Sequence, residues 1–537
     1  MMFAGGLNAA NKFDSKLEQL KKTNPNDTVR VIIQGIDPAF MSPQAAAVQA
    51  KLLKKFKYFH GFTMELKVKD LDKLANWHLI ISVDAPIKGH SAADGLEAPN
   101  NSSGALAAIQ KYAAMYPAAG AGVGVAIIDS GIASHPDLPN LVKTVDFTGG
   151  PNVPGDPFGH GTHVAGIIGG SGQSSQGLYA GVAPSARLIN LRVLDASGGG
   201  STSNVISAIE WAIDNRNALG DDGKPLNIRV LNISAGHAPY ESSSTDPLAV
   251  ACRQAVQAGL VVVVSAGNNG KDPITGNPAY GTITTPGIES SVITVGAITT
   301  WGTPSRADDV VSTFSSRGPT IDHLMKPDLA APGSRIVSAS SPGNYLATTY
   351  PALQIGTGYL KLSGTSMAAP EVSGAAAMIL SANPNLTPNL VKSILMYTAE
   401  KKGAALDVGA GEVNIAGAMD LATALNPNAA QGQYWLTNPA VFATPSDAIN
   451  GYVAVWSNTI VWSGSRYGDQ GGFMSYNRPV FGQTIVWGNT IVWDQAIVWD
   501  QTILWSETIL TGTTLVCDQP IFAETIIWDE TILWDEL

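Results

Sequence analysis

The chain has 537 residues, of which 45% are hydrophobic and 14% charged, and its formal net charge at pH 7 is -11. This length exceeds what one hydrophobic core usually serves, so we expect more than one folding unit. The composition excludes a largely disordered chain, and the acidic balance without a long basic run argues against nucleic acid or an anionic membrane as the main partner. No stretch approaches the roughly 18 apolar residues of a membrane-spanning helix.

The two cysteines and the N-terminus say little about compartment. Cys252 and Cys517 are far apart in the sequence, and we expect each to be a lone thiol and not half of a disulfide. The opening sequence MMFAGGLNAANKFDSKLEQ has neither the basic region nor the apolar core of a secretory signal. Location must therefore be inferred from other features.

The N-terminal part of the chain predicts a small α+β unit over residues 28–90, after an N-terminal segment at 1–27. Its expected elements, in chain order, are a strand at 28–37, a helix at 43–58, a strand at 61–67, a short helix within LKVKDLDKLANW and a strand within HLIISVDAP.

A joint rich in Gly, Ala, Ser and Asn follows at 91–122, and the pattern then changes to apolar strands that alternate with amphipathic helices. The helices include 202–219 and 246–258, and the strands are VGVAIID, ARLINLRVL, IRVLNIS, LVVVVSAG and SVITVGA. Alternating β and α units predict a parallel sheet that is covered by helices on both faces.

From about residue 426 the composition changes again, first to a linker at 426–450 and then to a repeat-containing region at 451–537. The repeat includes QTIVWGN, TIVWDQ and TILWSE, and four tryptophans recur every six residues, namely Trp487, Trp493, Trp499 and Trp505. Six is a multiple of two, so an extended strand places them on one face, whereas an α-helix does not. We expect β structure, either as successive rungs or hairpins, or as a β-prone appendage without a fixed fold.

Four segments of the chain supply the parts that a peptide-hydrolysing site needs, which are a nucleophile, a base, a group that orients the base, and donors for the oxyanion. In GVGVAIIDSGI an apolar strand ends at Asp129, which places a carboxylate at the rim where open α/β sheets bind ligands. In GHGTHVAGIIGG, His160 precedes a helix of small residues. His163, one turn later, is interpreted as a packed or capping histidine.

The other two segments carry Asn268 and Ser366. Asn268 ends the apolar run LVVVVSAGNNG, where its side-chain amide can donate to an oxyanion, while Asn269 suits a turn better. Ser366 opens the helix of LSGTSMAAPEVSGAAAMIL, and the N-terminus of a helix offers N–H groups to a developing negative charge. Ser201, in STSNVISAIE, fits the simpler role of a helix cap.

DSGI, HGTHVAG, GTSMAAP and KPDLAAPG resemble the motifs of the subtilisin-like serine peptidases, and the likeness covers roughly residues 105–425. The order Asp, His, Ser along the chain is the order known for subtilisin. The resemblance implies that Asp129 orients His160, that His160 acts as general base and then acid, and that Ser366 forms the acyl-enzyme. It also implies that Asn268 and the Ser366 amide bind the oxyanion.

The same resemblance implies a three-layer α/β domain with a mostly parallel sheet, an inhibitory propeptide in the small unit, and a β-rich tail. The family's substrate ledge falls on Ser234, Ala235 and Gly236, and the other pocket wall on Ser265, Ala266 and Gly267. Small residues at strand ends leave backbone groups open to pair with an extended peptide.

The resemblance further implies an extracellular monomer whose partners are polypeptide substrates and its own propeptide. We expect no required cofactor. Calcium stays open as an unsupported alternative, since Asp137 in HPDL matches one ligand of the calcium site of bacterial subtilisins but SGQSSQGLYAG lacks the Asn-containing loop of that site. A further departure is Glu371, where many relatives have His after GTSMAAP.

Two main functional hypotheses remain open at this point. In the first, the chain is a self-processing zymogen that is cut somewhere within residues 85–105. In the second, the Trp-repeat tail makes it mainly a surface-binding protein with an ancillary protease domain, because aromatic faces can stack on carbohydrate or on another chain. A pseudoenzyme is disfavoured, since no catalytic position of the family motif is substituted.

Overall fold

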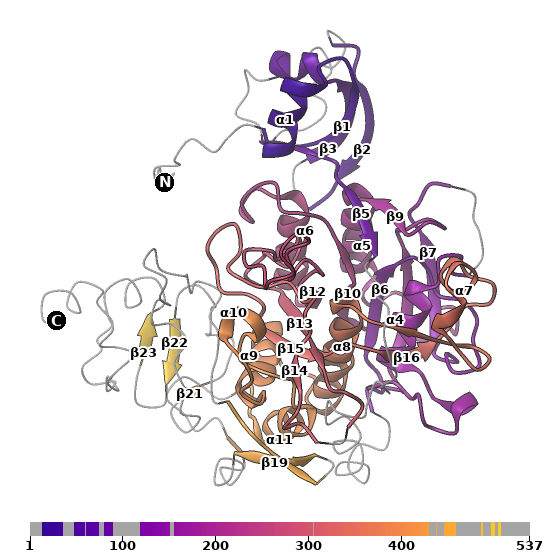
Figure 1. Ribbon diagram of the computed structural model, residues 1–537, viewed down its shortest axis with the longest axis vertical. Helices are drawn as coiled ribbons and strands as arrows, with labels where there is room; N and C mark the ends of the chain where they lie inside the picture. The colour runs from indigo at the N-terminus through magenta and orange to yellow at the C-terminus, as the bar shows by residue number, and fades with distance from the viewer. Residues whose placement is uncertain are drawn as a thin grey trace, which may run out of the picture.

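A computed structural model shows a small N-terminal unit that packs on a larger sheet-containing domain (Figure 1). The described residues are 13–35, 48–58, 61–74, 80–89, 119–150, 155–303, 305–428, 436–437, 445–449 and 451–457, with three short strands between 485 and 505. No helix in these ranges is both long enough and apolar enough to cross a membrane.

An eight-stranded sheet forms the centre of the larger domain, in the order β14-β13-β12-β10-β6-β8-β7, and β15 also pairs with β13. The strands are β6 (Gly124–Asp129), β7 (Leu141–Asp146), β8 (Arg187–Arg192), β10 (Ile228–Ile233), β12 (Val261–Ser265), β13 (Ile293–Thr299), β14 (Val310–Val311) and β15 (Leu329–Pro332). Neighbouring strands are parallel except β14, which is antiparallel to β13. The predicted α/β class with a mostly parallel sheet is confirmed.

Helices cover both faces of this sheet, and the alternation of side chains along β6 shows how. Val125 and Ile127 belong to one hydrophobic core, whereas Ala126 and Ile128 belong to the other. A buried parallel strand therefore needs apolar residues at every position, which is the run that the sequence shows. The first core lies under α4 (His160–Gly169), α8 (Thr365–Ala382), α9 (Pro388–Thr398) and α11 (Ile415–Ala424), and the second under α5 (Thr202–Asn215) and α6 (Pro247–Gln257).

Smaller elements complete the domain. β16 (Ile336–Ala339), β17 (Gln354–Ile355) and β18 (Tyr359–Leu362) form a three-stranded sheet, and the remaining short helices are α7 (Tyr345–Thr349), α10 (Ala405–Val408), η2 (Gln173–Ser175) and η3 (Pro351–Leu353). The two predicted amphipathic helices are observed as α5 and α6, each slightly shorter than expected.

The N-terminal unit is an antiparallel sheet in the order β2-β3-β1-β4, packed against α1 (Ser15–Thr23) and the 3-10 helix η1 (Val68–Leu74). Its strands are β1 (Thr28–Gln34), β2 (Lys51–Phe56), β3 (Gly61–Lys67) and β4 (Ile80–Val83). Phe13 and Leu17 are buried in its core, so α1 belongs to this unit although it precedes residue 28.

One sequence prediction in this unit is wrong. Residues 51–56, which lie inside the helix expected at 43–58, form the edge strand β2, while 36–47 lie outside the described residues. The segment KLLKKF carries its lysines on an exposed sheet edge, a placement typical of edge strands. Pairing with β3 outweighed the helical spacing of its apolar residues.

A strand continues from the N-terminal unit into the larger domain. β5 (Pro86–Gly89) lies between β9 (Gly199–Ser201) and β11 (Ala235–Gly236) and is antiparallel to both. Figure 1 shows β5 running down from the small unit to the upper end of the larger domain. The two units are thus connected by a shared three-stranded sheet as well as by the chain.

The segment expected to be a linker and the start of the tail packs partly on the larger domain. β19 (Ser446–Ile449) and β20 (Tyr452–Val455) form a hairpin, and the next residue, Trp456, is buried with its indole N–H donating to Asp447 at 2.6 Å. Tyr397 of α9 contacts the same indole edge to face.

Farther along the tail, β21 (Ile485–Val486), β22 (Ala496–Trp499) and β23 (Ile503–Trp505) pair antiparallel. Trp487, Trp493, Cys517 and most of the repeat region lie outside the described residues. Cys252 is a buried free thiol in α6.

Candidate active site

Three adjacent strands of the sheet, β12, β10 and β6, deliver polar residues at their carboxyl ends. Asp129 is the last residue of β6, Ser234 follows β10, and Asn268 lies three residues beyond the end of β12. Because these strands are parallel neighbours, their ends lie at one rim of the sheet.

Asp129 and His160 form a buried, directly bonded pair. His160 Nδ1 lies 2.8 Å from Asp129 Oδ1 and 3.0 Å from Oδ2, and both side chains are almost fully inaccessible to solvent. The backbone N–H of Ser130 also donates to Asp129 Oδ1 at 2.7 Å. A carboxylate in this position keeps a proton on Nδ1 and orients Nε2 away from itself, which is the arrangement that a general base needs.

The start of helix α4, which carries His160, is fixed by a second buried carboxylate. Asp156 accepts hydrogen bonds from the Gly159 N–H, the Thr162 N–H and hydroxyl, and the Ser130 hydroxyl, each at 2.8 Å. Ser130 Oγ in turn accepts from the N–H of Gly161 at 2.9 Å. Sequence reasoning missed Asp156, because nothing local in PNVPGDPFGH marks its role.

Two further residues of α4 explain its motif. A Cβ on Gly161 would lie 2.2 Å from the carbonyl oxygen of Gly131, so only glycine allows β6 and α4 to approach this closely. His163 Nε2 lies 3.1 Å from the carbonyl oxygens of both Ile336 and Leu360. Burial lowers the pKa of His163 to about 3, so the ring is neutral and structural. The interpretation of His163 as a packed histidine is confirmed.

Ser366 is the second residue of α8 and is tied to the end of β10 by two reciprocal bonds. Its hydroxyl donates to the carbonyl oxygen of Ser234 at 2.9 Å, and the Ser234 hydroxyl donates to the carbonyl oxygen of Ser366 at 3.0 Å. Asn232 supports the pair, because its amide donates to Ser234 Oγ and its oxygen accepts from Ser373. Helix α8 also packs against α4, which carries His160.

Asn268 is oriented by Thr365, a residue that sequence reasoning missed. Its Oδ1 accepts from the Thr365 N–H at 2.9 Å and from the Thr365 hydroxyl at 3.0 Å. With the amide oxygen committed to the start of α8, the Nδ2 group faces the other way and is available as a donor. Asn269 is exposed, and its backbone N–H donates to Ser316, in line with the turn role expected for it.

The predicted substrate ledge is occupied by β5. Ala235 is paired with Gly89 and Gly236 with Lys88, while on its other side β5 is paired with β9, a second ledge that the sequence did not suggest. A Cβ on Gly236 would lie 2.3 Å from the carbonyl oxygen of Thr285, which explains a glycine there.

The other predicted wall lies beneath the rim and has no strand pairing with β5 within the described residues. Ser265 ends β12. The backbone N–H of Ala266 donates to the carbonyl oxygen of Val295, and its own carbonyl oxygen accepts from the N–H of Thr284. Gly267 has a φ of 107° and its N–H donates to Thr365 Oγ1. This segment therefore sets the position of Asn268, which follows it.

Asp137 does not fit a calcium site. Its Oδ2 accepts from the Tyr359 hydroxyl at 2.5 Å, and its Oδ1 accepts from the Ser174 N–H at 2.7 Å. A calcium ion needs six to eight oxygen ligands, whereas here hydrogen-bond donors occupy both carboxylate oxygens. Across the described part of the chain, no cluster of three or more Asp, Glu, His or Cys side chains could hold a metal.

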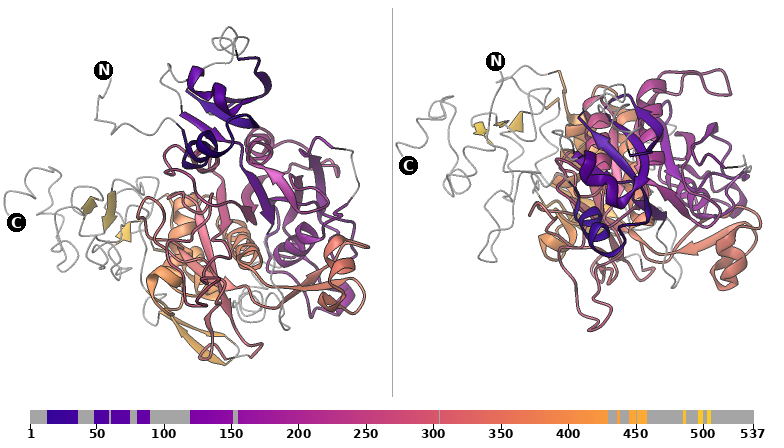
Figure 2. Two further views of the ribbon diagram at one scale, coloured as in Figure 1. Left: turned by 45° about the horizontal axis from the view of Figure 1, so that its top comes forward. Right: turned by 90° about the horizontal axis from the view of Figure 1, so that it is seen from above.

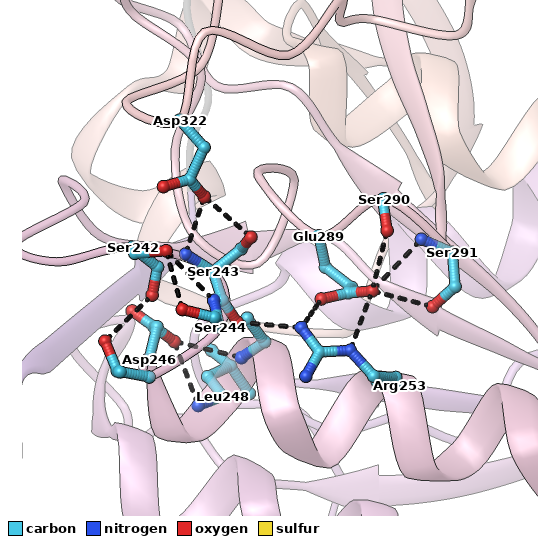
Figure 3. A network of polar contacts seen from close by, with 12 residues as sticks. Ser242, Ser243, Ser244, Asp246, Leu248, Arg253, Glu289, Ser290, Ser291 and Asp322 are labelled. Carbon is cyan, nitrogen blue, oxygen red and sulfur yellow. Dashed lines mark hydrogen bonds and ion pairs between the residues drawn. The ribbon is translucent and has the colours of Figure 1, made fainter. Parts of the chain in front are cut away.

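The N-terminal unit also contacts the loop at residues 240–246, which leads from β11 into helix α6. Ser15 donates to the carbonyl oxygen of Tyr240, and Gln34 donates to that of Thr245 at 2.6 Å. Figure 3 shows the contacts of this loop within the larger domain, where Ser243 donates twice to Asp322 and its carbonyl oxygen accepts from Arg253 of α6.

Comparisons with known proteins identify the family of this fold and site. The model of the subtilase family, peptidase S8, matches residues 120–418. The chain belongs to the subtilase family. Its members are serine peptidases that hydrolyse peptide bonds, so the resemblance seen in the sequence is confirmed for this domain.

Two curated subtilases illustrate how far the likeness extends. Serine protease AprX of Bacillus subtilis is 41% identical over 283 residues, which make up 52% of this chain and 62% of AprX. Subtilisin E of the same organism is 34% identical over 367 residues, 68% of this chain and 82% of that protein. The chain thus spans less than two thirds of the length of AprX.

A solved structure shows the same fold. The crystal structure of fervidolysin from Fervidobacterium pennivorans, described as a keratinolytic enzyme related to subtilisin, superimposes with a TM-score of 0.57 at 23% identity. The match covers 74% of this chain and 62% of fervidolysin. At this identity the likeness supports the fold alone.

Proposed function

We propose that this subtilase is a serine endopeptidase that is made as a self-processing zymogen. The observation that carries the proposal is the buried hydrogen bond between Asp129 and His160 at the sheet rim. His160 lies on α4, which packs against α8, the helix that has Ser366 as its second residue. In this proposal Asp129 orients the imidazole, His160 moves the proton, and Ser366 is the nucleophile.

The proposed chemistry is that of a serine nucleophile with a histidine base. In this proposal the Ser366 hydroxyl leaves the Ser234 carbonyl and bonds to His160 Nε2, which takes the hydroxyl proton as Oγ attacks the substrate carbonyl. The proton then passes to the leaving amine, and water hydrolyses the ester to regenerate the serine. Asn268 Nδ2 and the Ser366 N–H stabilise the oxyanion, since both belong to the start of α8 or are fixed to it.

The N-terminal unit serves as the intramolecular inhibitor in this proposal. β5 fills the space between β9 and β11, where an extended peptide substrate has to bind. The processing cut was expected within 85–105; residues 85–89 are described, and the others in that range lie outside the described residues.

The proposal extends to the location, the oligomeric state and the metal requirement of the enzyme. We infer an extracellular enzyme that acts as a monomer on polypeptides, as is typical of subtilases. We also propose that it needs no metal at Asp137, because protein donors already satisfy that carboxylate.

The experiment compares the full chain with Ser366→Ala, and uses Ser305→Ala, at an exposed position between β13 and β14, as a matched serine control. We expect the wild type and Ser305→Ala to cut themselves and to hydrolyse a peptide substrate, and Ser366→Ala to do neither, with a rate loss on the order of 10⁴-fold or more. Self-cutting by purified Ser366→Ala at the wild-type rate would contradict the proposed function.

A further inference from the structure

Thr284 and Thr285 join the two predicted substrate walls by backbone hydrogen bonds. The N–H of Thr284 donates to the carbonyl oxygen of Ala266, in the second wall, at 2.9 Å. Thr285 exchanges two backbone hydrogen bonds, of 2.9 and 3.1 Å, with His237, the residue that follows the first wall. The two threonines therefore connect one wall to the other.

The side chain of Thr284 lies where both walls have glycine. A Cβ built on Gly267 would lie 2.6 Å from Thr284 Cγ2 and 2.8 Å from Oγ1, and a Cβ built on Gly236 would lie 3.4 Å from the same Oγ1. The hydroxyl donates to the carbonyl oxygen of Ala266 at 3.1 Å, and the residue is 3% exposed. The side chain is thus held against both walls at once.

This position is adjacent to the groups that would hold a substrate carbonyl. Gly267 precedes Asn268, the proposed oxyanion donor, and the first wall begins at Ser234, whose carbonyl oxygen accepts the Ser366 hydroxyl at 2.9 Å. A substrate residue whose carbonyl carbon reaches Ser366 and whose carbonyl oxygen reaches Asn268 has its Cα one bond away. Its side chain therefore enters between the two walls, toward Thr284.

We propose that Thr284 is the floor of the pocket for this substrate side chain, and that it restricts the enzyme to cutting after small residues such as Ala and Ser. This inference rests on the proposed function above and adds the class of substrate. An aromatic or long aliphatic side chain would need the volume that the threonine methyl group occupies. The bonds to both walls keep Thr284 from moving aside, and closely packed side chains tolerate little added volume.

The composition of the walls bears on charged substrates as well. No residue of either wall is charged, and neither is Thr284 or Thr285. A lysine or glutamate side chain would therefore lose water without gaining an ion pair from these residues, which is unfavourable. The pocket should accept small, uncharged side chains.

The test uses two fluorogenic peptides that are identical except for Ala or Phe immediately before the scissile bond. Full chains of the wild type and of each variant process themselves, and kcat/KM is then measured for both peptides. We expect the wild type to favour the Ala peptide at least about tenfold. Thr284→Gly removes the whole side chain and should raise the Phe-to-Ala ratio of kcat/KM by at least about tenfold.

Two further variants separate the volume of Thr284 from its structural bonds. Thr284→Ser keeps the hydroxyl for Ala266 but lacks the methyl group, and should raise the ratio by a smaller factor than Thr284→Gly. Thr284→Val keeps the shape and loses the hydroxyl, so its ratio should stay within about threefold of the wild type. Both rates come from one preparation, so the fraction of folded enzyme cancels in the ratio.

The outcomes distinguish this inference from the proposed function. A wild type that cuts the Phe peptide as well as the Ala peptide would overturn the role of Thr284 and leave the peptidase function standing. The same holds if Thr284→Gly and Thr284→Ser leave the ratio unchanged, or if Thr284→Val raises it as much as Thr284→Gly does. A wild type that hydrolyses no peptide would instead contradict the proposed function itself.

Discussion

The larger domain and the N-terminal unit are held by different kinds of interaction. The sheet domain has an apolar core on each face, and the candidate catalytic residues are bonded to partners within that domain. The N-terminal unit has one small core of its own and meets the domain largely through polar contacts, in addition to the apolar Ile32, Phe56 and Ile87. Figure 2 shows the small unit seated on one end of the larger domain.

This difference indicates that the site is built independently of the N-terminal unit. Interior bonds such as Asp156 to Thr162 fix the catalytic geometry whether or not the N-terminal unit is bound. Once the N-terminal unit separates from the larger domain, the polar groups that joined them contact water and can titrate. Substitutions in the site should therefore change catalysis, while substitutions where the N-terminal unit contacts the larger domain should change the release of that unit.

After the loss predicted for Ser366→Ala, the largest effect is expected at the oxyanion position. Asn268→Ala removes one side-chain donor, and we expect kcat to fall about 10²- to 10³-fold with little change in KM, a magnitude established on subtilisin. The control is Asn269→Ala, whose side chain makes no contact that the site uses. Steady-state kinetics of the mature enzyme measure both; a loss smaller than about threefold for Asn268→Ala would contradict its assigned role.

The next effect concerns pH and the docking face. Burial, and then the nearby carboxylates Asp246 and Asp14, raise the pKa of Glu241 from 4.5 to about 8, against hydrogen bonds from Ser82 and Thr245 that lower it. His237 also faces this cluster through Asp246. A carboxyl group whose pKa is raised on docking must take up a proton to dock.

The N-terminal unit contacts this carboxyl group through Ser82 and lies near it through Asp14, so docking contributes to its burial, and docking should weaken as pH rises toward about 8. We expect the dissociation constant of the processed complex to rise between pH 6 and pH 8. Recovery of peptidase activity on dilution measures it, and Glu241→Gln should flatten the profile. An unchanged profile in that variant would remove Glu241 from the account.

A smaller effect tests whether the domain is stable without a metal at Asp137. Tyr359→Phe removes the hydroxyl that donates to this carboxylate, and should lower the free energy of unfolding by about 1.5–3 kcal/mol. A chelator should shift the melting temperature of the wild type by less than about 1 °C. Tyr345→Phe, at an exposed position, provides the control. Strong destabilisation by the chelator would show that a bound ion is required.

The smallest effect concerns a helix cap that crosses between the two units. Asp84 of the N-terminal unit accepts from the Ser203 N–H at 2.9 Å and from its hydroxyl at 2.8 Å, at the start of α5. Loss of such a cap costs about 0.5–2 kcal/mol, so Asp84→Ala should weaken docking by roughly 2- to 30-fold without changing kcat. Asp72→Ala, away from this contact, should leave docking unchanged; equal effects would contradict the cap.

The sequence predicted the parts of the fold that depend on apolar runs and short motifs. The buried strands of the sheet are continuous hydrophobic stretches, and Asp129, His160, Asn268 and Ser366 lie in motifs that are specific even without structure. The structure brings Asp129 to His160, Asn268 to the start of α8, and Ser366 to the end of β10.

The remainder depended on contacts between distant segments. Asp156 accepts a hydrogen bond at the start of α4, and Thr365 at the start of α8 donates to Asn268, a residue far away in the sequence. The role of β9 is visible only through its pairing with β5. The helix predicted at 43–58 is wrong over the residues of β2, because a short stretch of Leu and Lys suits a helix or a strand, and pairing with a neighbouring strand determines which one forms. The sequence therefore predicted the motif residues, but not the residues that hold them in position.

The most direct measurement of the central claim is active-site labelling with a fluorophosphonate, followed by peptide mapping. The account predicts one adduct, on Ser366, which forms on the mature protein after the N-terminal unit has been released and is absent from the unprocessed chain and from the variant His160→Ala. Labelling at another serine, or equal labelling of Ser366 when His160 is replaced, would show that these side chains do not work together.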